Sequence, residues 1–164
     1  MSGVAEITGN LQANRDAHHA RWGVDPCAWM TAGRRPAVGA PTARGDGRPE
    51  TPLEILAPGG AWYAVHDPHR PLDEARAWLA GVVDAARRAS AVCVIGAGAG
   101  WVIDALEEQR GDVRMLVLEP DSACCAAMFD RRDYRHLIEA GRLMVLGGPA
   151  FDGAAHAWRV LGRI

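Results

Sequence analysis

Blocks of apolar and polar positions alternate along the second half of the chain and predict strands followed by helices. Residues 91–95 form a continuous apolar run containing valine and isoleucine, which is typical of a buried parallel strand. The segment 113–121, which ends in acids, and the run 143–146 predict two further strands, whereas 101–111, 122–129 and 133–140 predict helices. Strands that alternate with helices predict an α/β fold with a parallel sheet and right-handed crossovers.

The first half of the chain is less regular. Glycine and proline are dense between 33 and 52, which predicts a long loop or mobile linker. The apolar segments 53–56 and 62–65 flank a Pro-Gly-Gly turn and predict a β-hairpin. A helix is expected over 71–88, with a proline and two acids in its first turn. A last helix is expected from Asp152 onward.

The N-terminal residues 7–22 predict a short helix. Thr8 or Asn10 is the expected cap, because a side-chain oxygen at that position accepts a bond from a free backbone N–H. The pair His18 and His19 has no partner at metal-ligand spacing, so we expect both rings on a solvated face of the helix.

Composition excludes several classes of function. The chain has 164 residues, of which 49% are apolar and 23% charged, as in one ordinary globular domain or one domain with an appendage. Its net charge of −2 gives no sign of the positively charged surface that binds nucleic acid or an anionic membrane. No apolar run reaches the roughly 20 residues of a membrane span. All 18 basic residues are arginine, which excludes Schiff-base lysines and the lysine of a P-loop.

The cysteines and the N-terminus predict a cytoplasmic protein with reduced thiols. Cys27, Cys93, Cys124 and Cys125 show no CxxC spacing, and the N-terminus lacks a cationic segment followed by an apolar one. Cys93 falls within the run 91–95 and is expected to be buried there.

The most informative stretch is the glycine turn after the first apolar run. Gly96, Gly98 and Gly100 alternate before the helix that begins near Trp101. A turn of this kind lets bare backbone N–H groups and the positive end of a helix approach a ligand. The dinucleotide fingerprint requires a further glycine where Trp101 stands, so the spacing favours the turn of S-adenosylmethionine-binding proteins and their relatives.

Two residues beside this turn are candidates for ligand contacts. Glu119 ends the second apolar run about 20 residues after the glycines, where this fold places an acid on ribose hydroxyls. It is alternatively an acid that complements the helix starting near Ser122. As an exposed acid, Glu119 would be replaceable by alanine at little cost in stability. The Trp101 indole either stacks on a base or fills the core.

A metal site is not expected. His66 and His69 stand close to Asp67 in the sequence before the helix at 71–88, but no further clustered ligand accompanies them. Hydrogen-bonding side chains on a loop are the simpler interpretation.

The expected architecture is a Rossmann-like parallel sheet that is incomplete. Three strands are fewer than the five or six of a doubly wound sheet, and we expect either the front portion of a longer protein or a domain that borrows a partner. Residues 1–52 would be an N-terminal helix and loop, and 53–164 a Rossmann-like nucleotide-binding domain.

Taken together, these segments resemble the N-terminal region shared by motility accessory factor glycosyltransferases, which act on flagellin, and by 6-hydroxymethylpterin diphosphokinase MptE-like proteins. The matching segments appear in the family's order and span most of residues 10–148. They are Asn10-Leu11, the loop and helix start His66 to Ala75, Gly96 to Trp101, Leu118 to Asp121, and Gly147-Gly148. The loop departs from the family at Asp67, His69 and Arg70.

The resemblance implies a glycosyltransferase module that uses an activated nonulosonic acid, such as a CMP-linked donor, with flagellin or another protein as acceptor. The family's transferase-bearing domain lies outside this chain, so no catalytic residue is assigned. The candidate ligand-binding residues are Gly96, Gly98, Gly100, Trp101 and Glu119.

Two other functions stay open. A class I S-adenosylmethionine-dependent methyltransferase would share the glycine turn, but it would need an acid where Val94 stands to orient the methionine part. A structural domain that kept the fold and lost the ligand is the third possibility.

Overall fold

The centre of the molecule is a parallel sheet, as the sequence predicts. The computed structural model describes residues 4–27, 37–38, 42–43, 49–50, 53–56, 62–86, 89–147, 153–154 and 157–159. The sheet consists of β6 (Ala91–Ile95), β7 (Arg114–Glu119) and β8 (Leu143–Gly147) in the order β6-β7-β8. Val94 pairs with Val117, which in turn pairs with Val145, so the three strands are in register. The expected open, Rossmann-like α/β architecture is confirmed.

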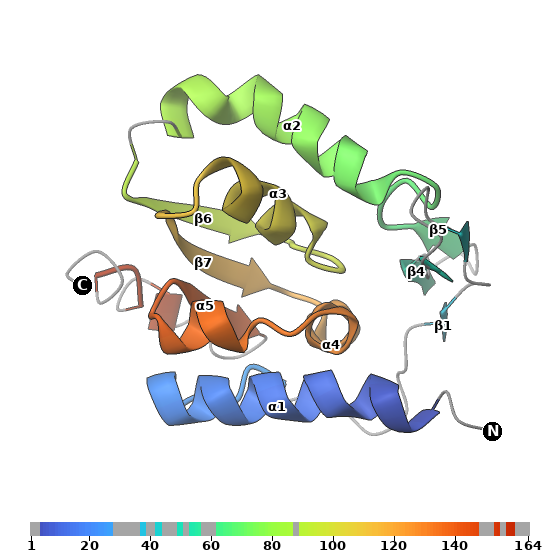
Figure 1. The fold of residues 1–164 in the computed structure, drawn as a ribbon, viewed down its shortest axis with the longest axis horizontal. Coiled ribbons are helices and arrows are strands. Elements are labelled where there is room, and N and C mark those ends of the chain that lie inside the picture. The colour runs from blue at the N-terminus through green and yellow to red at the C-terminus, as the bar shows by residue number, and fades with distance from the viewer. Residues whose placement is uncertain are drawn as a thin grey trace.

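The helices share one core on a single side of this sheet (Figure 1). Buried residues of β7, such as Met115 and Val117, meet Ile103, Phe129 and Leu137 from three successive helices. The three helices are α3 (Trp101–Gln109), α4 (Ser122–Arg131) and α5 (Arg135–Glu139). Residues of α2 (Pro71–Ala86) contribute to the same core. None of the helices in the described parts of the chain has the length and apolarity that crossing a membrane requires.

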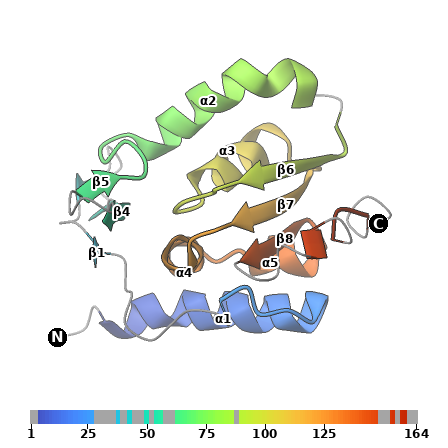
Figure 2. The ribbon, with the colours of Figure 1, turned by 180° about the vertical axis from the view of Figure 1, so that it is seen from behind.

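The opposite face of the sheet is covered over β8 but bare over part of β6 (Figure 2). Leu116 and Leu146 are buried there with Ala157, whereas Ile95 is 76% exposed and Cys93 is exposed. The expectation of a fully buried first strand, with Cys93 inside it, is therefore wrong. A continuous apolar run indicates burial on both faces. Whether another segment packs over a given face depends on the tertiary structure and cannot be read from the run itself.

The N-terminal helix α1 (Val4–Trp22) is longer than expected and belongs to the same core (Figure 1). Thr8 and Asn10 lie within the helix and do not cap it. Asn14 is fully buried and clamps α1 to the α4–α5 connection. Its Nδ2 donates to the Phe129 carbonyl oxygen at 2.8 Å, and its Oδ1 accepts from the Tyr134 N–H at 2.8 Å.

Two further side chains of α1 bond the outer edge of β8. His18 is buried and not on a solvated face, which corrects the sequence-based expectation. Its Nε2 accepts from the Val145 N–H at 2.9 Å, and its Nδ1 donates to the Val24 carbonyl oxygen at 2.7 Å. The Trp22 indole N–H donates to the Leu143 carbonyl oxygen at 3.0 Å. The helix thus satisfies backbone groups that a further strand would otherwise have bonded.

We expect the His18 imidazole to stay neutral until the pH falls to about 4, because burial lowers its pKa from 6.5 to about that value. Its contribution to stability is complete above pH 6.5 and is lost as the pH falls toward 4, since the unfolded chain then binds the proton more readily. The pH titration of the His18 ring signals by NMR measures this. A midpoint near 6.5 would contradict the buried, neutral arrangement.

The hairpin and the helix after it agree with the sequence. Strand β4 (Leu53–Leu56) pairs antiparallel with β5 (Trp62–Ala64), and α2 begins at Pro71 as expected. Within the predicted loop 33–52, the described residues form three short strands, and the rest lies outside the described residues. These strands are β1 (Ala37–Val38), β2 (Thr42–Ala43) and β3 (Pro49–Glu50). Residues 154 and 157–159 are helical where the last helix was expected, and the remainder of that segment is likewise not described.

Candidate functional site

The glycine turn between β6 and α3 has the backbone geometry that only glycine adopts readily. Gly96, Gly98 and Gly100 have φ angles of 73°, 54° and 86°, all in the left-handed region. A side chain at such a position is strained because its Cβ crowds the following carbonyl oxygen. The spacing identified from sequence is therefore a conformational requirement of the turn itself.

The space beside two of these glycines is filled by the protein. A Cβ on Gly98 would lie 2.8 Å from Val65 Cγ1, and a Cβ on Gly100 would lie 2.6 Å from the Tyr134 hydroxyl oxygen. A Cβ on Gly96 would meet nothing within 4 Å. Close packing against the chain's own side chains thus explains the glycines at 98 and 100, and Gly96 is the member of the three with open space beside it.

Glu119 reaches the same turn from the tip of β7. Its Oε2 accepts from the N–H groups of Ala97 and Gly98 at 2.8 and 3.0 Å, and its Oε1 accepts from the Asp121 N–H at 3.0 Å. The side chain is only 3% exposed, so the expectation of an exposed acid is wrong. Burial raises the pKa of this carboxyl, while the three N–H bonds act to lower it. The geometry makes Glu119 a brace for the turn, and its role toward ribose stays a prediction.

Trp101 begins α3 and is 5% exposed. The Arg131 guanidinium lies 3.8 Å from the centroid of its ring, and the His66 ring meets it edge-on at 6.1 Å. Arg131 is itself held by the Ala99 carbonyl oxygen at 2.7 Å and by Asp104 at 2.7 Å. The indole is therefore packed into the core, as one of the two interpretations had it, and it also forms part of a cavity wall.

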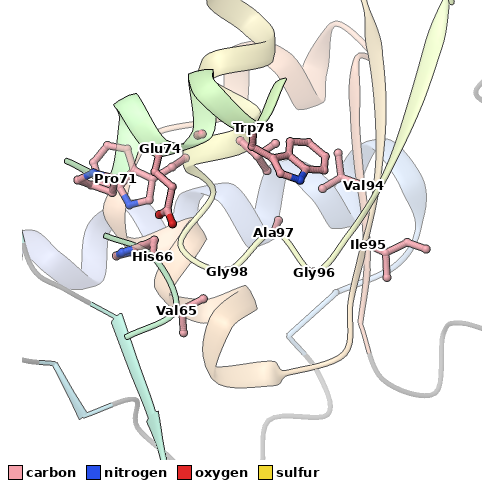
Figure 3. A pocket seen from close by; sticks show the side chains of 13 residues that line it. Val65, His66, Pro71, Glu74, Trp78, Val94, Ile95, Gly96, Ala97 and Gly98 are labelled. Carbon is pink, nitrogen blue, oxygen red and sulfur yellow. The ribbon is translucent and has the colours of Figure 1, made fainter. Parts of the chain in front are cut away.

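A cavity of about 250 Å³ lies between α2, the glycine turn and the start of α3 (Figure 3). It is at the carboxyl end of β6, where open α/β sheets bind their ligands. Of the residues predicted from sequence, Gly96, Gly98 and Trp101 line it, and Gly100 and Glu119 do not.

The α2 side of this cavity was not predicted from the sequence. Glu74 and Trp78 point from α2 toward the glycine turn (Figure 3). Val65 and His66 come from the loop that precedes α2. Glu74 and Trp78 are four residues apart and so share one helix face. A tryptophan outside the apolar face of the helix, one turn after an acid, is the signal in the sequence that could have pointed to them.

The cavity wall is mostly apolar and carries a negative charge. Among the described lining residues, Glu74 has the only carboxylate and none is arginine. Its Oε2 accepts from the Asp67 N–H at 2.6 Å, which fixes the carboxylate beside the loop. The described residues contain no group of three or more histidine, cysteine, aspartate or glutamate side chains placed to hold a metal ion.

An open parallel sheet, a glycine turn after its first strand and an acid at the tip of the next define a Rossmann-like α/β domain. No known family model matches the sequence, and no curated protein matches it. Among solved structures, the chain is similar to the MAf glycosyltransferase from Magnetospirillum magneticum AMB-1, with a TM-score of 0.53 and 16% sequence identity. The likeness covers 98% of this chain and 30% of that one. At this identity it shows a shared fold, and the assignment to the family stays a prediction.

Proposed function

We propose that this chain is the Rossmann-like module of a glycosyltransferase of the motility accessory factor type, acting in the cytoplasm on flagellin or another protein. The observation that carries the proposal is the cavity at the carboxyl end of β6, bounded by the glycine turn. A fold shared with the MAf glycosyltransferase along 98% of the chain supports it. The order of the motifs along the sequence supports it as well.

In this proposal the module binds a nucleotide-type ligand, and the transfer chemistry lies elsewhere in a longer protein. This chain spans 30% of the length of the similar structure, so a separate transferase region is compatible with the likeness. We assign no catalytic residue to the cavity. His66 and Glu74 are the titratable side chains on its wall among the described residues, and their role here is to shape and polarise it.

A class I S-adenosylmethionine-dependent methyltransferase is the second candidate. One observation favours it, namely that the charged group on the cavity wall is the Glu74 carboxylate, which suits a sulfonium ligand better than a phosphate. Against it, the position that would need an orienting acid is Val94, which is 4% exposed and apolar.

A thermal-shift panel tests the proposal. At about ten times its dissociation constant, a ligand of this cavity should raise the melting temperature of the chain by about 3–6 °C. The panel is CMP, CMP-sialic acid, S-adenosylmethionine, S-adenosylhomocysteine and NAD. The Trp78→Ala variant should lose the shift because it removes the most exposed aromatic side chain of the cavity wall.

Trp158→Ala is the matched control, since Trp158 is also partly exposed, at 41%, and does not line the cavity. It should keep the shift. If no compound of the panel stabilises the wild-type chain, and neither cytidine nor adenosine binds to it, the ligand-binding function is rejected and the scaffold interpretation takes its place. A shift with S-adenosylmethionine alone would favour the methyltransferase.

A further inference from the structure

We propose that the cavity beside the glycine turn accepts the nucleoside part of its ligand, base and ribose together, and disfavours phosphate, so that any phosphate group and any sugar attached beyond it stay outside the cavity. This inference rests on the proposed ligand-binding function of the same cavity. It names the chemistry that the cavity selects, which is an uncharged or cationic nucleoside. Three separate observations lead to it.

The first observation concerns the hydrogen-bond donors of the turn. Phosphate-binding turns work because their backbone N–H groups point at the anion. Here those groups donate within the protein, to Glu119 from Ala97 at 2.8 Å and from Gly98 at 3.0 Å. The Gly96 N–H donates to the Leu118 carbonyl oxygen at 2.9 Å, and the Gly100 N–H to that of Ala97 at 2.8 Å. A phosphate would have to displace the buried Glu119 carboxylate to reach the N–H groups of Ala97 and Gly98.

The second observation concerns charge. The Glu119 carboxylate lies directly behind the turn, and the Glu74 carboxylate stands on the opposite wall. Arg131, the guanidinium that packs on Trp101, is paired with Asp104 at 2.7 Å and does not line the cavity. Because like charges repel at short range, the Glu74 carboxylate disfavours a phosphate beside it, whereas a neutral or cationic group is tolerated there.

The third observation concerns size and shape. A volume of about 250 Å³ is smaller than the roughly 300–1,000 Å³ of sites that enclose a whole drug-sized ligand. A complete nucleotide sugar therefore cannot be enclosed. Trp78 supplies most of the indole surface of the wall and Trp101 a small part, which suits a flat heteroaromatic ring. Figure 3 shows Trp78 over the turn, beside Val94.

The experiment compares each nucleoside with its own 5′-phosphate, using the cytidine–CMP and adenosine–AMP pairs and the indole N–H signals of the ¹⁵N-labelled chain. The wild-type protein should bind the nucleoside about tenfold more tightly than the phosphate. This gap should narrow as sodium chloride is raised, because salt screens the repulsion.

Glu74→Gln is the decisive variant. The glutamine oxygen can still accept the bond from the Asp67 N–H, so the change removes the charge and retains the contact. We expect the ratio of CMP affinity to cytidine affinity to rise about five- to tenfold. Glu139→Gln is the control, because Glu139 is an exposed acid of α5 that does not line the cavity. It should leave the ratio unchanged.

The outcomes separate this inference from the proposed function. If the phosphates bind as well as the nucleosides, and Glu74→Gln leaves the ratio unchanged, phosphate exclusion is overturned while ligand binding stands. A different outcome rejects ligand binding itself, and this inference with it. In that case no nucleoside or nucleoside phosphate binds to the wild type or to Glu74→Gln, and no compound of the thermal-shift panel raises the melting temperature.

Discussion

Replacing Gly100 with alanine is expected to lower the free energy of unfolding by about 3–5 kcal/mol. The φ angle of Gly100 is 86°, so any Cβ is strained there. The added carbon would also lie 2.6 Å from the Tyr134 hydroxyl oxygen and 2.7 Å from Met128 Cγ, and both residues are buried. Chemical denaturation of the purified variant measures the loss.

Gly96→Ala is the matched control for this change. Its φ angle of 73° carries similar strain, but a Cβ there meets nothing within 4 Å. The control should therefore lose only about 1–2 kcal/mol. Equal losses in the two variants would show that Tyr134 and Met128 move aside freely, and that packing does not select glycine at position 100.

Replacing Glu119 with alanine is the second change with a large expected effect, a loss of about 3–5 kcal/mol in unfolding free energy. Three backbone N–H groups would lose their acceptor, and each such loss costs about 1–3 kcal/mol when water cannot fully replace the carboxylate. The shift in denaturation midpoint, with the same slope, measures it.

The exposed acid Glu139 of α5 provides the comparison, because Glu139→Ala should change stability by less than about 0.5 kcal/mol. If the Glu119→Ala variant unfolds at the wild-type midpoint, Glu119 does not stabilise the turn. The original expectation, a carboxylate available to ribose, would then be the better explanation of its position. The two roles thus predict opposite results from one substitution.

The sequence pattern pointed to the glycine turn and to Glu119, but it did not show what these residues contact. Alternating glycines and an acid about 20 residues later are local patterns, so the turn and Glu119 could be identified without coordinates. What each residue contacts could not. Val65 fills the space beside Gly98, and Tyr134 fills that beside Gly100, from 33 and 34 positions away in the chain.

The α2 wall shows a second kind of limit. Leu72, Ala75 and Leu79 mark the buried face of this helix by their spacing, and the helix itself was predicted on that basis. Glu74 and Trp78 are simply polar-face residues in the same pattern. They become cavity residues only because α2 packs beside α3 and brings that face over the glycine turn.

By itself, the sequence determined the order of strands and helices, the parallel sheet and the glycine turn, because these depend on residue periodicity and on conformations that only glycine adopts. Only the tertiary structure decided that His18 bonds the edge of β8, that Cys93 and Ile95 are exposed, and that Glu119 faces the turn. Those facts depend on contacts between segments up to 127 positions apart, for which local patterning carries no information.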